Sequence, residues 1–424
     1  MHAIENDEIS GTFKVRTITF FKHFQELPKS KDWWSSFVET TLLKLQSIRH
    51  AIEELGIEVQ MIRLATNIME KLLSEASFEE VIQRAVEFEH VAVDCHLPVL
   101  NLGTIRDRNF IRHPDGLREL MKHLKTSFVS VLWDQSFGMS DALSISRSII
   151  GMERNEPGTN FRFGVLCNCK GGIPYFPAAF ADETHVNGGI ALGIENSQLL
   201  QYCYESAQEA YHRTDPVEDF SCPLKILEET ITRTFSSALQ PLEERVVQAA
   251  REEQVDYVGI DTSIAPDLGG PENNMEKCLT MMSPQGLPTT THRPWMAGSA
   301  ATVDAITRAI KAVDVQTCGY CGVMLPVLEN DSLASAAEMN TLTVQKLLLY
   351  SNMCGVGLDV LPVSVNGEEA EHRMAALLLD VAAISARQNK PLSVRLLPVF
   401  DSEPGEKTNF DFNPYIINGV IMDF

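Results

Sequence analysis

The sequence predicts an α/β fold in which helices cover a mostly parallel sheet, and two observations carry this prediction. Short β-branched and apolar runs of the kind found in strands occur along the whole chain. Between most of them lie longer stretches in which apolar residues recur every three or four positions, as on one face of a helix. Strands joined by such helices pair in parallel. The periodicity leaves open whether the sheet is open or closed.

Roughly ten strands are expected. The candidate segments are 15–20, 57–64, 90–97, 128–134, 161–168, 189–194, 255–262, 322–327, 356–363, 392–399 and 415–422. The clearest helical stripe begins near Trp34 and ends before Gly56, which is suited to the left-handed residue that follows a helix. Ser77 with Glu80 forms a capping-box pattern that predicts the start of another helix.

Charge and composition limit the partners of this 424-residue chain. It carries 35 Lys and Arg against 57 Asp and Glu, a formal net charge of −22, so its surface repels nucleic acids and anionic lipids. No apolar stretch is long enough to span a membrane. We therefore expect a small-molecule ligand, with no nucleic-acid and no membrane partner. A homo-oligomer is expected from base rates alone.

Domain organisation and location follow from weaker signals. No linker-like change of composition is visible, so we expect an acidic N-terminal extension over residues 1–14 and one large domain over 15–424. The nine cysteines are odd in number and unevenly spaced, which suits a reducing compartment. The first residues lack the basic and apolar regions of a signal peptide, and a cytoplasmic protein is expected.

Two acidic residues at strand ends are candidates for chemistry. Asp261 and Ser263 share one face where an apolar strand runs into a Pro/Gly-rich turn, and they either serve a ligand or cap the turn. Asp359 interrupts an apolar strand, where a carboxylate must be paired, hydrogen-bonded or neutral. It is either functional or part of a structural ion pair with Arg16 or Arg395.

Cysteine and histidine patterns suggest two further sites. Cys318 and Cys321 form a CxxC between glycines, which is typical of zinc binding or of a reactive thiol but also of buried cysteines. If 90–97 is a strand, Asp94 and His96 lie on one face. Glu183 and His185 have the same spacing. Together these four predict a divalent metal site, provided that the two segments are neighbours; otherwise they are solvated strand ends.

Several motifs are absent from the sequence. We find no GxGxxG after a strand, no GxxxxGK[ST], no GxSxG and no HExxH. No nucleotide cofactor is therefore expected, and α/β-hydrolase or zincin chemistry is disfavoured. The cofactor is otherwise unknown, with a divalent metal as the one candidate.

The order of several short motifs resembles the uncharacterised domain-of-unknown-function family 711, whose members are often called PFL family proteins. The resemblance runs from about residue 15 to about residue 400. Its motifs are Val15-Arg16-Thr17-Ile18-Thr19, Asn168 with Pro174 and Phe180, Asp261-x-Ser263-x-Ala265-Pro266, Leu325-Pro326-Val327 and Cys354-Gly355-Val356-Gly357-Leu358-Asp359.

The resemblance implies a closed barrel of about ten strands, similar to pyruvate formate-lyase and ribonucleotide reductase. In such a barrel the residues expected to converge at the mouth are Arg16, Thr17, Asp261, Ser263 and Asp359. Radical chemistry is not implied, because the chain lacks the Arg-Val-x-Gly-Tyr/Phe loop of glycyl radical enzymes; residues 418–420 are Asn-Gly-Val. Bacterial members lie beside small ACT-domain proteins, which points to amino-acid metabolism or sensing.

These observations predict an enzyme that acts on a small anionic metabolite, such as an amino acid or 2-oxo acid, in the barrel mouth. We expect non-redox acid/base or metal-assisted chemistry of the lyase, isomerase or hydrolase type. Asp359 or Asp261 is the expected acid/base and Ser263 an orienting group. Substrate-binding candidates are Arg16 as carboxylate anchor, Thr17, Asn168 and His292. The alternative is a non-catalytic, amino-acid-binding regulatory protein.

Overall fold

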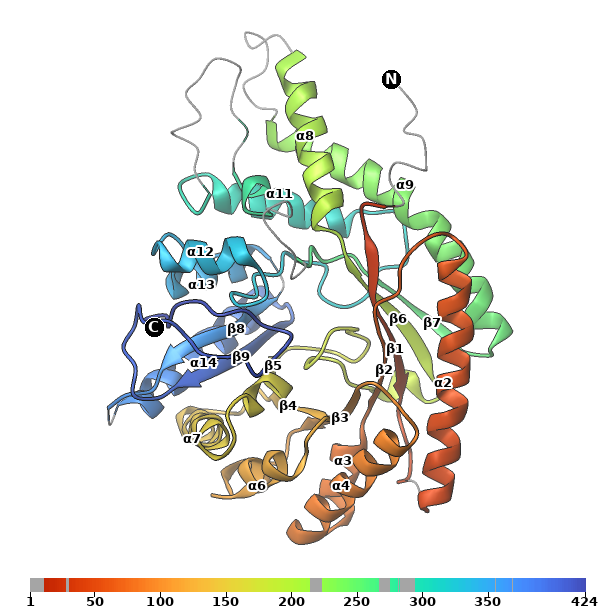
Figure 1. The fold of residues 1–424 in the computed structure, drawn as a ribbon, viewed down its shortest axis with the longest axis vertical. Helices are drawn as coiled ribbons and strands as arrows, with labels where there is room; N and C mark the ends of the chain where they lie inside the picture. Colours follow the sequence, from red (N-terminus) through yellow and green to blue (C-terminus); the bar gives the residue numbers. More distant parts are fainter. Residues whose placement is uncertain are drawn as a thin grey trace.

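A single nine-stranded sheet organises the chain in the computed structural model (Figure 1), which describes residues 11–27, 30–213, 223–266, 275–280, 282, 294–354, 356–367 and 369–424. The strands are β1 (Lys14–Lys22), β2 (Ile62–Thr66), β3 (Leu100–Ile105), β4 (Phe128–Trp133), β5 (Phe163–Cys167), β6 (Gly189–Glu195), β7 (Asp256–Asp261), β8 (Gly357–Ser364) and β9 (Leu392–Val399). Their spatial order is β7-β6-β1-β2-β3-β4-β5-β9-β8. The predicted α/β class with a mostly parallel sheet is confirmed.

Two antiparallel contacts divide the sheet into blocks of parallel strands. β1 to β5 run in parallel, whereas β6 pairs antiparallel with β1 at one edge of this block and β9 pairs antiparallel with β5 at the other. β7 is parallel to β6, and β8 is parallel to β9. The first residues of β1 to β5 therefore lie level with the last residues of β6 and β7.

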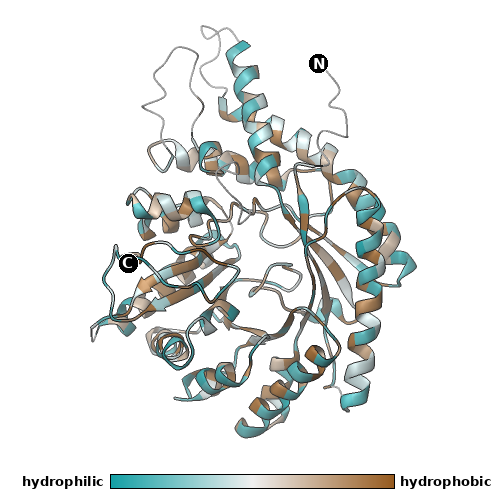
Figure 2. Ribbon diagram, in the orientation of Figure 1, coloured by the Kyte–Doolittle hydropathy of each residue, from teal (hydrophilic) through white to brown (hydrophobic). Residues whose placement is uncertain are grey.

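Helices lie outside the curved sheet and turn their apolar sides toward it (Figure 2). They are α2 (Lys31–Glu53), α3 (Ile68–Glu75), α4 (Phe78–Asp94), α5 (Arg108–Arg112), α6 (Gly116–His123), α7 (Met139–Asn155), α8 (Ser197–Arg213), α9 (Pro223–Glu252), α10 (Met275–Cys278), α11 (Ser299–Lys311), α12 (Asp331–Glu338), α13 (Val344–Met353) and α14 (Ala370–Gln388), with the short 3-10 turns η1 (Thr159–Arg162) and η2 (Glu183–His185). None of them combines the length and hydropathy that crossing a membrane requires.

Isolated bridges extend the pairing beyond the two edge strands. Ile260 and Ile264, in and after β7, bridge in parallel to Thr317 and Val323. Three residues further on, Pro326 bridges in parallel to Asp359 of β8. The segment 316–327 thus contacts both edges of the sheet, although it forms single bridges instead of the regular strand expected over 322–327.

The prediction of a strand over residues 90–97 was wrong. Ser77 and Glu80 cap a helix, as predicted, but this helix continues to Asp94, so residues 90–94 belong to α4. Val81, Ala85 and Phe88 are buried at intervals of four and three residues, the spacing of a helix and not of a strand. The strand itself follows at β3. The segment expected over 415–422 is likewise no strand and makes single bridges at Val420 and Met422.

The connection from β5 to β6, residues 168–188, lies on the concave side of the sheet (Figure 1). Thr19 Oγ1 of β1 donates to the carbonyl of Pro174 over 2.7 Å. Asn101 Nδ2 of β3 and Ser130 Oγ of β4 donate to the carbonyl of Pro177 over 2.9 and 2.7 Å. Buried polar groups on three strands thereby fix this loop, which carries Tyr175 and Phe176 into the interior.

Glu89 gives the fold a pH dependence that can be measured. Its buried carboxylate accepts the backbone N–H groups of residues 125 to 127, just before β4. Burial opposes ionisation, but the three N–H groups outweigh it and lower the pKa of Glu89. Its stabilising contribution is therefore present above the unfolded pKa of about 4.3 and is lost as the pH falls through the folded value.

We expect Glu89→Gln to lower the free energy of unfolding by about 1.5–3 kcal/mol at pH 7, the range for hydrogen bonds to a charged group. Urea titrations of both proteins between pH 3 and 7 measure the difference. It should shrink toward pH 3, and a difference that does not vary with pH would contradict the assignment.

Candidate functional site

A cavity of about 120 Å³ lies at the end of the sheet where β1 to β5 begin. Three arginines and two carboxylates line it, together with aromatic and apolar side chains; the charged residues are Arg16, Arg63, Glu329, Asp359 and Arg395. One water molecule needs roughly 10–15 Å³ of such volume, so the cavity has room for several water molecules or a small ligand.

β-Bulges position two of the charged residues. Arg16 is the extra residue of β1 where the pairing with β6 shifts between Val15 and Thr17. Asp359 and Val360 lie in the shift between β8 and β9. Val360 has a φ of 47°, a left-handed conformation that is strained for a β-branched residue. Bulges of this kind turn a side chain away from the regular alternation of a strand, here toward the cavity.

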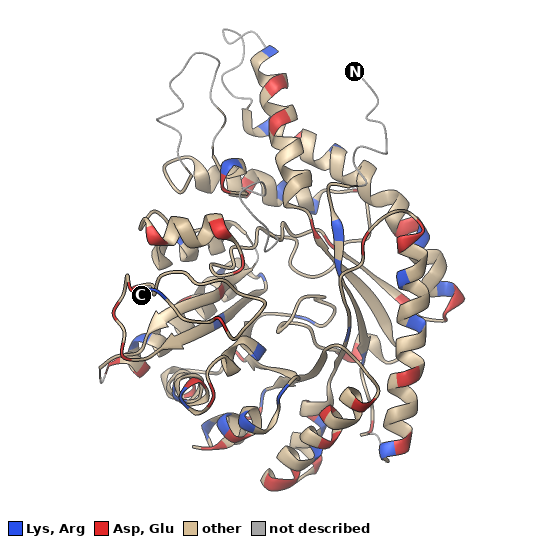
Figure 3. Cartoon of the chain, viewed as in Figure 1, with Lys and Arg blue, Asp and Glu red and all other residues tan. Residues whose placement is uncertain are grey.

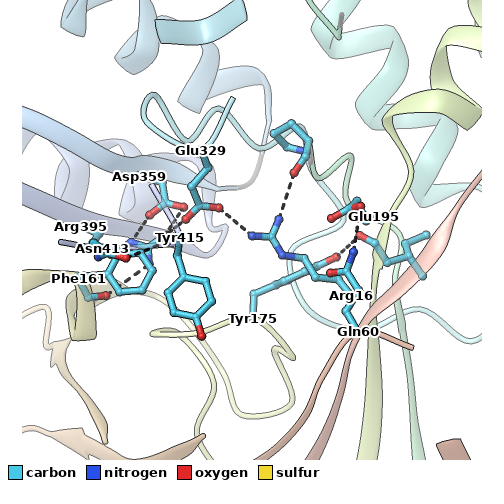
Figure 4. Close-up of polar contacts among 12 residues, drawn as sticks. Arg16, Gln60, Phe161, Tyr175, Glu195, Glu329, Asp359, Arg395, Asn413 and Tyr415 are labelled. Carbon is cyan, nitrogen blue, oxygen red and sulfur yellow. Dashed lines mark hydrogen bonds and ion pairs between the residues drawn. The ribbon is translucent and has the colours of Figure 1, made fainter. Parts of the chain in front are cut away.

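Glu329 joins the two arginines of the strands into one network (Figure 4). One carboxylate oxygen of Glu329 accepts from Arg16 over 2.8 Å, and the other accepts from Arg395 over 2.8 Å. Arg395 also holds both oxygens of Asp359, with Nε to Oδ1 at 2.7 Å and a terminal nitrogen to Oδ2 at 3.1 Å. Arg16 makes a second contact, over 3.2 Å, to the carbonyl of Pro266.

The two carboxylates have different acidities. Burial raises the pKa of Asp359, and the nearby charge of Glu329 adds to this, against the opposing effect of Arg395. Burial also acts on Glu329, but the guanidiniums of Arg16 and Arg395 outweigh it and lower the pKa of that carboxyl. A pair of carboxyl groups with divergent pKa values is the usual arrangement for acid/base chemistry.

Arg63 is the cavity arginine without a carboxylate partner in the part of the chain that the structure describes. Its Nε contacts the sulfur of Met61 at 3.4 Å, and its guanidinium stacks on the ring of Phe176 at 5.0 Å. Burial and the neighbouring charge of Arg16 lower the pKa of Arg63 to about 9. The side chain is therefore a cation at neutral pH, and although the charge of Glu329 acts on it, no carboxylate of the described residues pairs with it directly.

Aromatic side chains form one wall of the cavity. Phe161 stacks on Tyr415 with 5.8 Å between ring centroids, and the guanidinium of Arg395 lies 4.8 Å from the centre of the Phe161 ring. Tyr415 comes from the C-terminal segment and is half-exposed, and in Figure 4 its ring lies between Arg395 and Arg16. The charged groups are thus in contact with apolar surface, where electrostatic interactions are strengthened.

Asp261 and Ser263 do not line this cavity. The Asp261 carboxylate accepts the Ser263 hydroxyl over 2.6 Å and the backbone N–H groups of Ser263, Tyr320 and Cys321 over 2.8 to 3.0 Å. Gly319, with φ of +73°, permits this close approach, since a Cβ there would lie 2.1 Å from the carboxylate. Both residues are fully buried, so the geometry supports the turn-capping interpretation.

The structure does not assemble the predicted metal site. Asp94 ends α4 and pairs with Lys31 at 3.7 Å, while His96 lies in the following turn. Glu183 and His185 belong to η2, where His185 pairs with Asp182 at 3.0 Å. Among the described residues, no group of three or more His, Cys, Asp or Glu could hold a metal ion. The prediction depended on a strand parity that a helix does not have.

The environment of the CxxC does not favour a reactive thiol. Burial raises the pKa of Cys321 to about 12 and that of Cys318 well above the ordinary value, with the Asp261 carboxylate acting in the same direction. Both side chains are therefore neutral thiols at pH 7, whereas nucleophilic cysteines have depressed pKa values.

Two of the remaining substrate-binding candidates, Thr17 and Asn168, do not line the cavity. Thr17 is fully buried and bonds Thr19 at 3.2 Å, so it helps to hold the loop that carries Tyr175. Asn168 bonds Asn389 at the surface over 3.2 Å. His292 lies outside the described residues.

Sequence reasoning missed Glu329 and Arg63 as site residues and named Arg395 only as an ion-pair partner of Asp359, which it is. Arg63 looks like an ordinary outward residue of an alternating strand. Glu329 follows Pro326 in a segment without regular structure, 313 positions from its partner Arg16. An apolar run interrupted by Pro326 and followed by a lone acid is the one signal that could have identified it.

Comparisons with known proteins identify a family but no activity. The model of the family described as "Uncharacterised ACR (DUF711)" matches residues 9–411. The UPF0210 protein of Pyrobaculum aerophilum is 23% identical over 416 residues, which are 95% of this chain and 87% of that protein. Those of Lactobacillus delbrueckii and Syntrophobacter fumaroxidans are 24% and 26% identical, and the match covers 57% and 51% of their lengths.

One solved structure is weakly similar. The methanol:cobalamin methyltransferase complex MtaBC from Methanosarcina barkeri aligns with 89% of this chain and 68% of its own, at a TM-score of 0.20 and 9% identity. A similarity of this size carries no argument about fold or function.

Proposed function

The chain belongs to the DUF711 family, and from its cavity we propose that it is an enzyme that acts on a small carboxylate by acid/base chemistry of the lyase, isomerase or hydrolase type. The observation that carries the proposal is the charge of the cavity wall. Three guanidiniums face two carboxylates, and Arg63 is left without an acidic partner among the described residues. A monoanionic ligand supplies the missing charge.

The course of the sheet supports a closed barrel around this cavity. Residues 316–327 bridge to β7 and β8, the two edge strands of the nine. Counted as a tenth strand, this segment would close the ring into two parallel blocks of five that meet at antiparallel contacts. The cavity would then lie at one mouth of the barrel, with the loop 168–188 as its floor.

The roles of the residues follow from their contacts. Arg63 is the proposed anchor for the carboxylate, because only its Nε makes a hydrogen bond in the described structure and a guanidinium binds a carboxylate with two parallel hydrogen bonds. Glu329 holds Arg16 and Arg395 in place. Asp359 is the proposed proton donor or acceptor, since its pKa is raised and it lines the same cavity.

A second function, ligand binding without turnover, is favoured by one contact. Both oxygens of Asp359 accept from Arg395, an arrangement that keeps a carboxylate in place and occupies one lone pair of each oxygen. In a regulatory protein this pair would only shape the pocket. Incubation of the protein with ligands that it binds, followed by NMR of the ligand, separates the two functions.

Arg63→Gln tests the anion site. We expect pyruvate to raise the melting temperature of the wild-type protein, and its uncharged analogue pyruvamide to have little effect. In Arg63→Gln the affinity for pyruvate should fall by a factor of about 10 to 150, corresponding to the roughly 1.5–3 kcal/mol of a charge-assisted hydrogen bond. Thermal-shift titrations with other small carboxylates, including amino acids, extend the test.

The matched control is Arg373→Gln. Arg373 also stacks on a phenylalanine, Phe424, at 4.5 Å, but it lies near the C-terminus and outside the cavity. The affinity of Arg373→Gln for pyruvate should equal that of the wild-type protein. Without ligand, Arg63→Gln should keep or exceed the wild-type stability, because it removes a partly buried cation that has no carboxylate partner in the described structure. Equal pyruvate binding by wild type and Arg63→Gln would contradict the proposal.

A further inference from the structure

A second basic site lies on the outside of the molecule, in a groove formed by α5, α6 and α7. Its volume is about 360 Å³, and four arginines line it: Arg112, Arg118, Arg147 and Arg154. It shares no lining residue with the central cavity. Basic residues gather on and around α6 at the lower left of Figure 3, although the whole chain carries a formal charge of −22.

The helical repeat of α7 produces one wall of the groove. Arg147, Gly151 and Arg154 follow one another at intervals of four and three residues, so they lie on one face of the helix. Gly151 makes room for Arg118 of α6, since a Cβ at this position would come within 2.6 Å of the Arg118 side chain. Three guanidiniums from two helices thereby share one surface.

Nearby acids occupy only part of the donors of these arginines. Arg112 Nε bonds Asp141 over 2.8 Å, Arg147 Nε bonds Glu371 over 2.6 Å, and a terminal nitrogen of Arg118 bonds Asp115. A guanidinium has five N–H donors, so most of them stay unused in these pairs.

Arg154 has no carboxylate partner within the residues described and stacks on Phe400 at 5.0 Å. Arg118 Nε is buried and finds no acceptor in the described structure. Stability does not account for such a cluster, because exposed ion pairs contribute about 0–1 kcal/mol each, and gathering like charges is unfavourable.

We propose that this groove binds a small oxyanion with at least two negative charges, of the phosphate or pyrophosphate type. Clustered guanidiniums are the usual ligands of such groups, since their planar forks match the oxygen geometry. The groove is three times the volume of the cavity, and its four guanidiniums keep N–H donors that their acidic partners leave free, so it suits a larger oxyanion with more acceptor oxygens than the cavity does.

Calorimetric titration with pyrophosphate, at constant ionic strength, tests the proposal. We expect the wild-type protein to bind pyrophosphate, and Arg154→Gln and Arg118→Gln each to bind it at least tenfold more weakly. Arg308→Gln is the control for general loss of positive charge, since Arg308 is an ion-paired surface residue of α11 that does not line the groove. It should bind as the wild type does.

The central cavity provides the second control. Arg63→Gln should leave pyrophosphate binding unchanged, whatever its effect on pyruvate. Loss of pyrophosphate binding in Arg63→Gln but not in Arg154→Gln would place the anion in the cavity and overturn the proposal. So would equal weakening in Arg308→Gln and Arg154→Gln, or the absence of any binding at millimolar pyrophosphate.

Discussion

A Glu329→Gln protein should lose about 3–5 kcal/mol of unfolding free energy, the cost of removing one partner from a buried ion pair. The Glu329 carboxylate accepts one hydrogen bond from each of Arg16 and Arg395, and its side chain is 7% exposed. An amide has one acceptor oxygen and no charge. At least one guanidinium would therefore stay buried without a counter-ion, which is costly because few other groups can solvate it.

Glu338→Gln is the matched control. Glu338 pairs with Lys407 over 2.7 Å, but both side chains are more than half exposed. The same substitution should change stability there by less than about 1 kcal/mol. Urea titration of the three proteins at pH 7 measures both differences. If Glu329→Gln lowers the free energy of unfolding no more than Glu338→Gln does, the network does not make the contribution to stability that we assign to it.

A double variant separates the network from local packing. Adding Arg16→Met to Glu329→Gln removes the guanidinium that has lost its carboxylate partner, while Arg395 keeps its bidentate pair with Asp359. The double variant should therefore be more stable than Glu329→Gln alone. Such non-additivity is expected for residues in direct contact and absent for independent ones.

The fold class could be predicted from the sequence because periodicity is a local property. β1, β4, β5 and β9 fall within a few residues of the expected segments, and the capping box of α4 was found at its position. The error at 90–97 arose where polar residues on the exposed face of a helix imitated the alternation of a strand. The helical spacing of buried Val81, Ala85 and Phe88 extends over a longer segment and is the stronger signal.

The site was predicted only where a residue contradicted its surroundings. Asp359 was found because a carboxylate within an apolar strand needs an explanation, and Arg16 because it lies in a family motif. Asp261 gave the same signal, yet its partners are backbone N–H groups about 60 positions later, and sequence shows no such partner. Arg63 gave no signal, since a charged residue on an alternating strand is ordinary until the fold encloses it.

Asp359→Asn should separate binding from chemistry. If Asp359 transfers the proton, turnover of a bound carboxylate should fall by about 10²- to 10⁴-fold, the usual contribution of a general acid or base. Affinity should move the opposite way, because the substitution removes a negative charge from a cavity that we propose to bind an anion. If Asp359 has only a structural role, Asp359→Asn should lower both turnover and ligand affinity. Ligand binding by thermal shift and turnover by NMR of the ligand give the two readings.

The pH dependence of pyruvate binding tests whether the charge of Asp359 opposes binding. The pKa of Asp359 is raised by burial, so in the wild-type protein this carboxyl gains its proton, and the cavity loses a negative charge, at a higher pH than an exposed aspartate would. Pyruvate affinity should therefore increase as the pH falls through that pKa. Asn resembles the protonated form, so Asp359→Asn should lose this dependence and bind with high affinity throughout the range below about pH 9, where Arg63 keeps its charge. If the wild-type affinity for pyruvate decreases as the pH is lowered through this range, Asp359 does not face the bound anion. The acid/base role would then belong to another group of the cavity.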